Sequence, residues 1–263
     1  NTAIVGASGY GGEILVKLLA AHPKVNLVAV TSRSGAGKSV SSLMPWLRGV
    51  LDSLKFENSE PHALAARTDI DCVFLAVPHG VAAEYAGVIS KSGKKVIDCS
   101  ADFRISDPAV YEEYYGQPHP DKTLLKDSQY ILPEITEGGW AEKKIFACPG
   151  CYPTSILLPI IPLVKNKCLS LKNIIIDSKS GYSGAGRGVH KKYKDKNLYE
   201  SLSAYGVGFH RHNSEIDQML RKFTKKKFQF SFTPHLSPMF RGILSTIYVD
   251  LENNISQSKV LKT

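Results

Sequence analysis

The sequence predicts an α/β protein of two domains: a Rossmann dinucleotide-binding domain over residues 1–150 and an α+β domain with a mixed sheet over residues 151–263. Three observations carry this prediction. The chain has 263 residues, which is enough for two domains. Its first half alternates strand-like and helix-like segments around a glycine-rich turn. Its second half has long strand-like runs with fewer helices.

The elements of the first half follow from apolar periodicity. Apolar residues of Gly11–Ala21 recur at helical spacing, and Val81–Ser90 is predicted to form a second helix. Four apolar runs predict strands: Thr2–Val5, Asn26–Thr31, Cys72–Val77 and Lys95–Asp98. Nearly continuous apolar strands joined by helical crossovers are typical of a parallel sheet covered on both faces.

The second half predicts a different kind of sheet. Leu171–Ser178 is a β-rich run, Phe228–Phe232 alternates with a period of two, and Gly242–Val249 is a further strand-like run. Long strands with few intervening helices favour an α+β domain with antiparallel or mixed pairing. We place the boundary between the two domains near residue 150.

Composition and charge exclude several classes of protein. No apolar run approaches the roughly 18 residues that span a membrane, and there is no secretory signal. The net charge of +9 favours anionic small ligands. Two lysine clusters, 191–196 and 225–227, are interpreted as solvated faces, because no stacking aromatics or known motif indicate nucleic acid.

Five cysteines, an odd number, indicate a reduced protein, expected in the cytoplasm, or in a plastid or mitochondrion after transit-peptide removal.

A glycine-rich turn, Gly6–Gly12, follows the first strand and opens the first helix. Glycines there permit a tight turn and a close backbone approach, so the helix N-terminus can hold a pyrophosphate. The alternative is a tight turn that binds nothing. The residues expected to contact the cofactor are Gly6, Ser8, Gly9, Tyr10 and Gly11. Pro78 and His79, which follow a parallel strand, are expected to line the same site.

The end of the second strand favours NADP over NAD. NAD-binding folds place an acid there for the ribose hydroxyls, whereas this chain has Ser32, Arg33 and Ser34. Hydroxyls and a guanidinium suit a 2′-phosphate. The alternative is that Arg33 is a solvated loop residue. The neighbouring run 35–39 lacks the first glycine of a phosphate loop, so we discount an ATPase.

Cys151 is the candidate nucleophile. It precedes an apolar segment, Thr154–Val164, that is expected to be helical, and a helix N-terminus favours a thiolate. Two alternatives stay open, because Cys148 and Cys151 have the spacing of a redox pair or of half a zinc site. A zinc site needs a second pair of ligands, and we predict no metal.

The segment His210–Ile216 is the best source of a base. His212 and Glu215 lie three residues apart and share a face of a predicted helix, so a carboxylate can orient the imidazole. The alternative is a helix cap with surface histidines. Two segments are candidates for anion binding: the one ending at Arg104, and the serine- and glycine-rich run 178–187.

These motifs together resemble the N-acetyl-γ-glutamyl-phosphate reductase family of acyl-phosphate reductases. The matching stretches run in order along the chain: Gly6–Gly12, Pro78–Gly80, Ser100–Arg104, Leu132–Glu134, Pro149–Thr154, Ser180–Arg187, His210–Ile216 and Thr233–Gly242. The resemblance implies an NADPH-dependent enzyme of arginine biosynthesis that assembles as a homodimer or homotetramer. It also implies that the second domain is catalytic and mediates oligomerisation.

The resemblance also implies roles for individual residues. Cys151 would be the nucleophile, His212 the acid/base and Glu215 a supporting carboxylate. Ser180 and Gly181 would contact the cofactor. Substrate would be contacted by Arg104, Ser183, Gly184 and His210. The expected reaction reduces N-acetyl-glutamyl 5-phosphate to N-acetyl-glutamate 5-semialdehyde and phosphate through a cysteine thioester.

The sequence departs from the family at two points. Cys148 stands where the family usually has asparagine, close enough in sequence to trap Cys151 as a disulfide. The family's chains also continue well past residue 263, and residues before Thr2 are expected to be missing. Other functions considered are an aspartate-semialdehyde dehydrogenase, a related acyl-phosphate reductase with a free or carrier-linked substrate, and an NADP-binding redox sensor that uses Cys148 and Cys151.

Overall fold

A computed structural model describes residues 1–187, 200–224 and 226–263. The lysine cluster 191–196 and Lys225 therefore lie outside the described residues. The chain divides into two compact units. The first comprises Asn1–Pro108, Pro118–Ile131 and Gly138–Cys148, and the second comprises Ala109–Gln117, Leu132–Glu137 and Pro149–Thr263.

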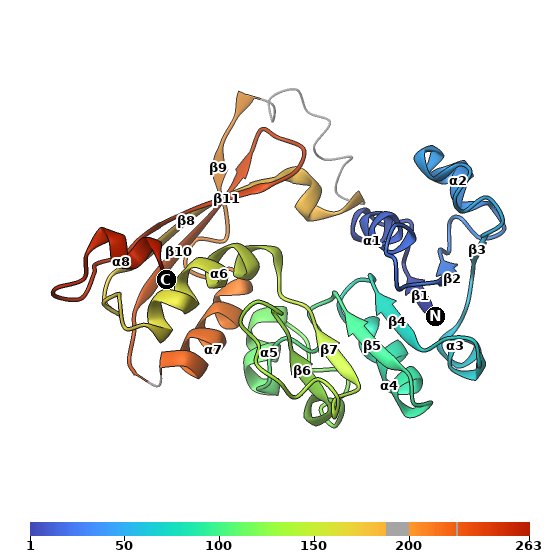
Figure 1. Ribbon diagram of the computed structural model, residues 1–263, viewed down its shortest axis with the longest axis horizontal. Coiled ribbons are helices and arrows are strands. Elements are labelled where there is room, and N and C mark those ends of the chain that lie inside the picture. Colours follow the sequence, from blue (N-terminus) through green and yellow to red (C-terminus); the bar gives the residue numbers. More distant parts are fainter. Residues whose placement is uncertain (188–199, 225) are drawn as a thin grey trace. The chain divides into compact units, whose positions relative to one another are not determined.

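The first unit is built on a seven-stranded sheet in which every pairing is parallel, in the order β3-β2-β1-β4-β5-β7-β6 (Figure 1). The strands are β1 (Thr2–Val5), β2 (Leu27–Thr31), β3 (Phe56–Glu57), β4 (Cys72–Leu75), β5 (Lys95–Asp98), β6 (Ser128–Tyr130) and β7 (Ile145–Ala147). The strand order reverses beside β1, and ligands of such sheets bind at the carboxyl ends next to this switch point.

Helices cover both faces of this sheet, as the alternation of β1 shows. Ile4 belongs to one apolar cluster, whereas Ala3 and Val5 belong to another on the opposite face. The helices are α1 (Tyr10–Ala20), α2 (Val40–Leu43), α3 (Pro61–Ala66) and α4 (Ala82–Lys91), with short 3₁₀ turns at Pro45–Leu47 and Leu124–Asp127. The predicted parallel Rossmann sheet, covered on both faces, is confirmed.

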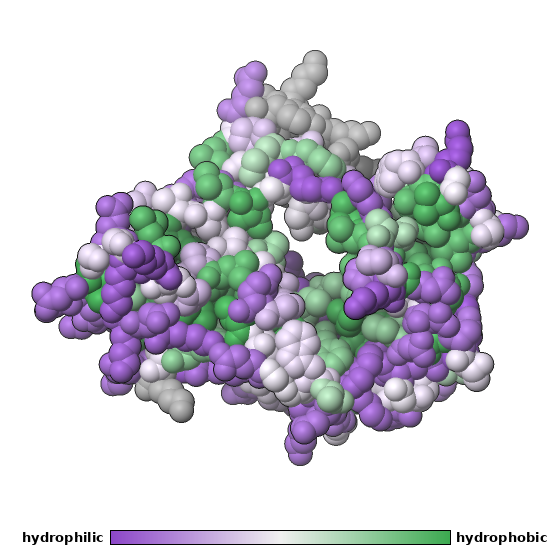
Figure 2. Space-filling model, in the orientation of Figure 1, coloured by the Kyte–Doolittle hydropathy of each residue, from purple (hydrophilic) through white to green (hydrophobic). Residues whose placement is uncertain are grey.

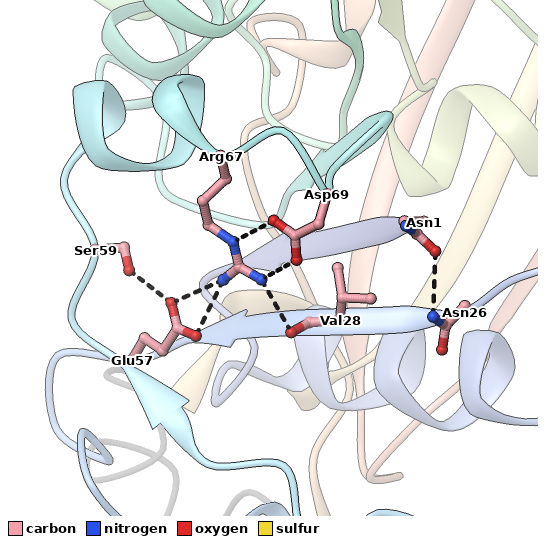
Figure 3. A network of polar contacts seen from close by, with 7 residues as sticks. All are labelled: Asn1, Asn26, Val28, Glu57, Ser59, Arg67 and Asp69. Atoms are coloured by element: carbon pink, nitrogen blue, oxygen red, sulfur yellow. Dashed lines mark hydrogen bonds and ion pairs between the residues drawn. The ribbon is translucent and has the colours of Figure 1, made fainter.

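A polar network ties the edge of the sheet together (Figure 3). The Arg67 guanidinium donates to both carboxylate oxygens of Glu57 on β3 and to the carbonyl oxygen of Val28 on β2. It also donates to Asp69, at 2.6 Å from Nη2, and this bond raises the pKa of Arg67. One arginine thus connects the short edge strand to its neighbour.

The second unit contains a four-stranded mixed sheet in the order β11-β8-β10-β9. Its strands are β8 (Ile174–Gly181), β9 (Ser203–Ala204), β10 (Phe230–Ser237) and β11 (Ile243–Tyr248). β8 and β10 run parallel, and the outer strands pair antiparallel to them, which confirms the predicted mixed sheet. The helices are α5 (Pro108–Tyr115), α6 (Cys151–Lys165), α7 (His212–Thr224) and α8 (Gln257–Leu261), with a 3₁₀ turn at Tyr182–Ala185.

Two predicted strand boundaries in this unit are wrong. Leu171–Ser178 was expected as a strand, but β8 begins at Ile174 because Asn173 has a left-handed φ of 57°. β10 begins at Phe230 rather than Phe228 and continues through Pro234. Sequence alternation did not reveal this extension, because a proline lacks the N–H that a strand normally donates.

Contacts of aromatic rings help to place the short stretch Ala109–Gln117 in the second unit. The ring of Tyr114 stacks on Phe209 with centroids 5.1 Å apart, and the guanidinium of Arg211 lies 5.8 Å from the Tyr115 ring.

The outer surface seen in Figure 2 is mostly hydrophilic, interrupted by hydrophobic patches. Within the described residues, no helix is long and apolar enough to cross a membrane.

Candidate active site

Cys151 is the first residue of α6, and its side chain is exposed. Gly150, in extended conformation, precedes it as the N-cap residue. The peptide dipoles of the 15-residue helix place positive partial charge at this end, which stabilises a thiolate. The expected helix is present and starts three residues earlier than predicted, despite Pro159 and Pro162.

His212 and Glu215 lie in the first turn of α7 and meet the backbone that carries the cysteine. The Gly150 N–H donates to Oε1 of Glu215 at 2.8 Å, and the Glu215 side chain is fully buried. A Cβ on Gly150 would lie 2.6 Å from Nε2 of His212 and 3.0 Å from Oε2 of Glu215. The shared helix face inferred from their spacing therefore brings both side chains against the residue before Cys151.

His210 has a capping contact at the start of α7. Its Nδ1 accepts a hydrogen bond from the backbone N–H of His212 at 3.1 Å, so this nitrogen carries no proton. Burial lowers the pKa of His210 to about 4, with a further contribution from the charge of Arg211. His210 is therefore a neutral imidazole near neutral pH, whatever contact it makes with a substrate.

A pocket of about 320 Å³ opens beside these residues in the second unit. Six predicted site residues line it: Cys151, Ser180, Gly181, Gly184, His210 and His212. Sequence reasoning missed six others: Tyr152, Ala185, Ser203, Tyr205, Arg211 and Leu236. Tyr152 stood inside a recognised motif, whereas no motif or periodicity marked Tyr205.

Tyr152 and Tyr205 join two sides of this pocket. Their hydroxyl oxygens are 3.0 Å apart, and burial raises the pKa of both phenols. The Tyr152 ring also meets the rings of His210 and His212 edge to face, with centroids 5.6 and 5.8 Å away. This tyrosine, the second residue of α6, therefore packs against both histidines.

The loop at the end of β8 is shaped by the segment before β11. Gly181 N–H donates to the Gly242 carbonyl oxygen, and Ser183 N–H donates to that of Phe240, both at 2.9 Å. A Cβ on Gly181 would lie 2.8 Å from backbone atoms of Phe240 and Arg241, so only glycine fits. Two motifs distant in sequence thus form one wall of the pocket.

In the first unit, the glycine-rich turn has the close backbone approach expected of a dinucleotide-binding turn. Gly6 has a φ of 83°, and a Cβ on Gly12 would lie 2.2 Å from the Gly6 carbonyl oxygen. Gly9 is the N-cap of α1, whereas a Cβ on Gly11 would meet no atom within 4 Å. Ser8 and Tyr10 are half-buried in this turn. The turn and the α1 N-terminus fit a pyrophosphate.

The candidate 2′-phosphate residues differ in exposure. Ser32 is buried, and its hydroxyl donates to Oγ of Ser8 at 2.7 Å and accepts from the Gly35 N–H at 3.0 Å. Arg33 and Ser34 are exposed at the carboxyl end of β2. Ser32 thus shapes the turn, whereas Arg33 and Ser34 are open to solvent, and their contact with a 2′-phosphate stays a prediction.

A buried carboxylate that sequence reasoning did not single out organises the loop after β4. Oδ1 of Asp102 accepts from the Gly80 N–H at 2.7 Å, and Oδ2 accepts from the Ala83 N–H at 3.0 Å. Pro78 and His79 are exposed on this loop. Nearby, Nε of Arg104 donates to the Cys148 carbonyl oxygen at 2.7 Å and Nη2 donates to that of Cys99 at 2.8 Å. The predicted substrate contact of Arg104 stays a prediction.

Two protein families match nearly the whole chain. The family described as Semialdehyde dehydrogenase, NAD binding domain matches residues 1–141, and the one described as Semialdehyde dehydrogenase, dimerisation domain matches residues 151–263. The N-acetyl-gamma-glutamyl-phosphate reductase of Citrifermentans bemidjiense is 48% identical over 94% of this chain and 71% of its own. That of Akkermansia muciniphila is 47% identical over 99% of this chain and 75% of its own.

The chain belongs to the N-acetyl-gamma-glutamyl-phosphate reductase family. The resemblance found in the sequence motifs is thereby confirmed. Solved structures share the fold of this reductase at low identity. Aspartate semialdehyde dehydrogenase II from Vibrio cholerae, complexed with ASA, is 16% identical with a TM-score of 0.74, covering 100% of this chain and 77% of its own. The enzyme from Candida albicans with NADP is 16% identical with a TM-score of 0.69, covering 99% and 74%.

Proposed function

We propose that this chain reduces N-acetyl-glutamyl 5-phosphate to N-acetyl-glutamate 5-semialdehyde and phosphate, with NADPH, in arginine biosynthesis. The observation that carries the proposal is the contact of His212 and Glu215 with Gly150, directly before the exposed Cys151. A thiol at a helix N-terminus beside an imidazole is the arrangement that acyl transfer to sulfur needs. Membership of the reductase family names the substrate class.

The chemistry proceeds in two stages at Cys151. Its thiolate attacks the acyl carbon, the bond to the phosphate oxygen breaks, and a thioester remains on the enzyme. NADPH, when bound, supplies the hydride that reduces this carbon. His212 then serves as the acid/base while the carbon–sulfur bond breaks, which releases the aldehyde and restores the thiolate.

Glu215 acts as a positioning residue in this proposal. Its Oε1 is held by the Gly150 N–H, so its carboxylate is fixed relative to both the cysteine helix and the imidazole. A fixed carboxylate keeps the base in one orientation. Ser183, Gly184, Arg104 and His210 are proposed to contact the substrate, and Ser180 and Gly181 the cofactor.

The cofactor is proposed to be NADP rather than NAD. Support comes from Arg33 and Ser34, exposed where the second strand ends, and from the absence of an acid at that position of the sequence. The proposed residues for the remainder of the cofactor are Gly6, Ser8, Gly9, Tyr10, Gly11, Ser32, Pro78 and His79.

We also propose a homo-oligomer, a dimer or tetramer, in the cytoplasm. Support for oligomerisation comes from the match to a dimerisation domain and from exposed apolar residues on one face of the second-unit sheet: Ile175, Leu244 and Tyr248. Light scattering that gave the mass of one chain, 28.8 kDa, would contradict oligomerisation. Cell fractionation of the producing organism tests the compartment.

The reaction is tested by following NADP reduction with N-acetyl-glutamate semialdehyde and phosphate. Cys151→Ser should lower the rate to less than a few per cent of the wild type, because a hydroxyl is a far weaker nucleophile than a thiolate. Cys72→Ser, at a half-buried cysteine on β4, is the matched control and should keep the rate. A Cys151→Ser enzyme with more than a few per cent of the wild-type rate would contradict the role.

Two further assays distinguish the alternative functions, one with a different substrate and one with a different cofactor. Replacing the substrate by aspartate semialdehyde should abolish most activity; preference for it would indicate an aspartate-semialdehyde dehydrogenase. NAD in place of NADP should react more slowly. A protein that reduces neither cofactor but cycles between dithiol and disulfide forms would be a redox sensor.

A further inference from the structure

Two cysteines outside the pocket lie side by side at the carboxyl edge of the first-unit sheet. The parallel strands β5 and β7 pair Asp98 with Ala147, and the ladder continues because the Cys148 N–H donates to the Asp98 carbonyl oxygen at 2.8 Å. Cys99 and Cys148 are the next pair in this register, so their side chains leave the same face. Neighbouring strands lie about 4.7–4.9 Å apart, within the roughly 4.4–6.8 Å between the Cα atoms of disulfides.

The two thiols contact each other. The Cys99 thiol is hydrogen-bonded to the sulfur of Cys148, and this bond lowers the pKa of Cys148. The same bond, together with burial, raises the pKa of Cys99. Cys148 is therefore the more acidic thiol of the pair, and Cys99 is the donor.

Arg104 holds the backbone of both cysteines. Its guanidinium donates to the carbonyl oxygens of Cys99 and Cys148, as described above. Its charge lowers the pKa of Cys148, whereas burial and the charge of Asp98 raise it. One side chain thus fixes the ends of two neighbouring strands. Both cysteines are half-buried rather than enclosed, so a small reagent can reach them.

We propose that Cys99 and Cys148 form a modification site, a thiol pair that a low-molecular-weight disulfide such as oxidised glutathione converts into a disulfide between β5 and β7. The Cys148 thiolate attacks one sulfur of glutathione disulfide, and one glutathione thiolate leaves. Cys99 then loses its proton and attacks the Cys148 sulfur of the mixed disulfide, and the second glutathione thiolate leaves. Two cysteine thiols lose two electrons and two protons, and glutathione disulfide becomes two thiols.

This pairing differs from the one that sequence spacing indicated. The neighbour expected for Cys148 was Cys151, three residues on, but none of the five cysteines is in a disulfide and the thiol that interacts with Cys148 is that of Cys99. Cys72, by contrast, is the first residue of β4, at the amino-terminal ends of the parallel strands, and burial raises its pKa to about 11. It therefore offers a control cysteine in the same unit.

The test is peptide mapping of the whole chain after incubation with reduced and oxidised glutathione at defined ratios. Remaining thiols are blocked, and the protein is digested with trypsin without reduction. Cleavage after lysine and arginine gives one peptide of residues 96–104 with Cys99 and another of residues 145–165 with both Cys148 and Cys151. The proposal predicts that these two peptides become linked, and that the link persists in Cys151→Ser and in Cys72→Ser.

The link should disappear in Cys99→Ser and in Cys148→Ser. An unlinked wild type, a disulfide formed within peptide 145–165 instead, or a link that disappears in Cys151→Ser would each overturn the proposal. If a serine variant at 99 or 148 fails to fold by circular dichroism, the wild type, Cys72→Ser and Cys151→Ser decide the question. The readout is a peptide mass and not a rate, so its failure is distinguishable from failure of the proposed reaction.

Discussion

In the first unit the glycine-rich turn is fixed by backbone packed on backbone within seven residues, whereas in the second unit the site around Cys151 is fixed by side chains from a distant helix. Gly12 meets the Gly6 carbonyl oxygen. Gly150 instead meets Glu215, which is 65 residues away in sequence. The first site is therefore defined by one continuous sequence motif, whereas the second forms only when α7 is packed in place. This difference predicts which substitutions damage folding and which damage activity.

The largest expected effect is on stability, at Gly12. A methyl group there would lie 2.2 Å from a backbone oxygen that cannot move without breaking the turn. Gly12→Ala should lower the free energy of unfolding by about 3 kcal/mol or more, measured by urea denaturation. The matched control is Gly11→Ala, whose methyl group meets no atom within 4 Å and which should raise stability by about 0.5–1 kcal/mol. Equal effects of the two substitutions would show that the turn is not closely packed.

Gly150→Ala should act mainly on activity. The new methyl group would displace the imidazole of His212 and the carboxylate of Glu215, which are side-chain groups and not backbone. A displacement of about 1 Å costs roughly 100-fold in rate, so we expect a loss of that order in kcat. The measurement is steady-state NADP reduction together with urea denaturation. A variant that loses stability as much as Gly12→Ala but keeps its rate would contradict the contrast between the two units.

The smallest effects are on the pH dependence of stability, where the units should respond in opposite directions. Burial raises the pKa of Asp98 in the first unit to about 6, from 3.8. The pKa of Asp98 is higher in the folded state than in the unfolded state. The stabilising contribution of protonated Asp98 is therefore complete below about pH 3.8, and it is lost as the pH rises through about 6. Asp98→Asn should therefore gain on the order of 1–3 kcal/mol relative to the wild type between about pH 4 and pH 7.

His210 in the second unit should behave in the opposite way. Its folded-state pKa of about 4 lies below the usual 6.5, so its contribution is complete above 6.5 and is lost as pH falls through about 4. His210→Gln should lose the most stability relative to the wild type near neutral pH, and the difference in free energy of unfolding should shrink as the pH falls. Urea denaturation across this range checks both variants, and the same slope for both would contradict the assignment.

Sequence predicted the first unit more closely than the second, for physical reasons. The apolar strands and the turn at Gly6–Gly12 depend on local periodicity and glycine geometry, and both are present. The roles of Cys151, His212 and Glu215 were inferred from motifs, but their meeting point at Gly150 was not, because it depends on packing between α6 and α7. Tyr205 and Asp102 were missed since their contacts are long-range. The Cys99–Cys148 pair was missed because strand order, not sequence spacing, makes those residues neighbours.

The separation of Gly150 and Glu215 in the sequence also sets the order in which the parts of the site are synthesised. Cys151 leaves the ribosome 61 residues before His212 (212 − 151), so the nascent chain carries its cysteine for that interval without the imidazole and carboxylate that later surround it. In that interval the thiol lacks its acid/base partner, and a lowered pKa can come only from the N-terminus of α6. Packing of α7 therefore completes the site late. Cys151 has the imidazole and the carboxylate as neighbours only in a chain that has already folded.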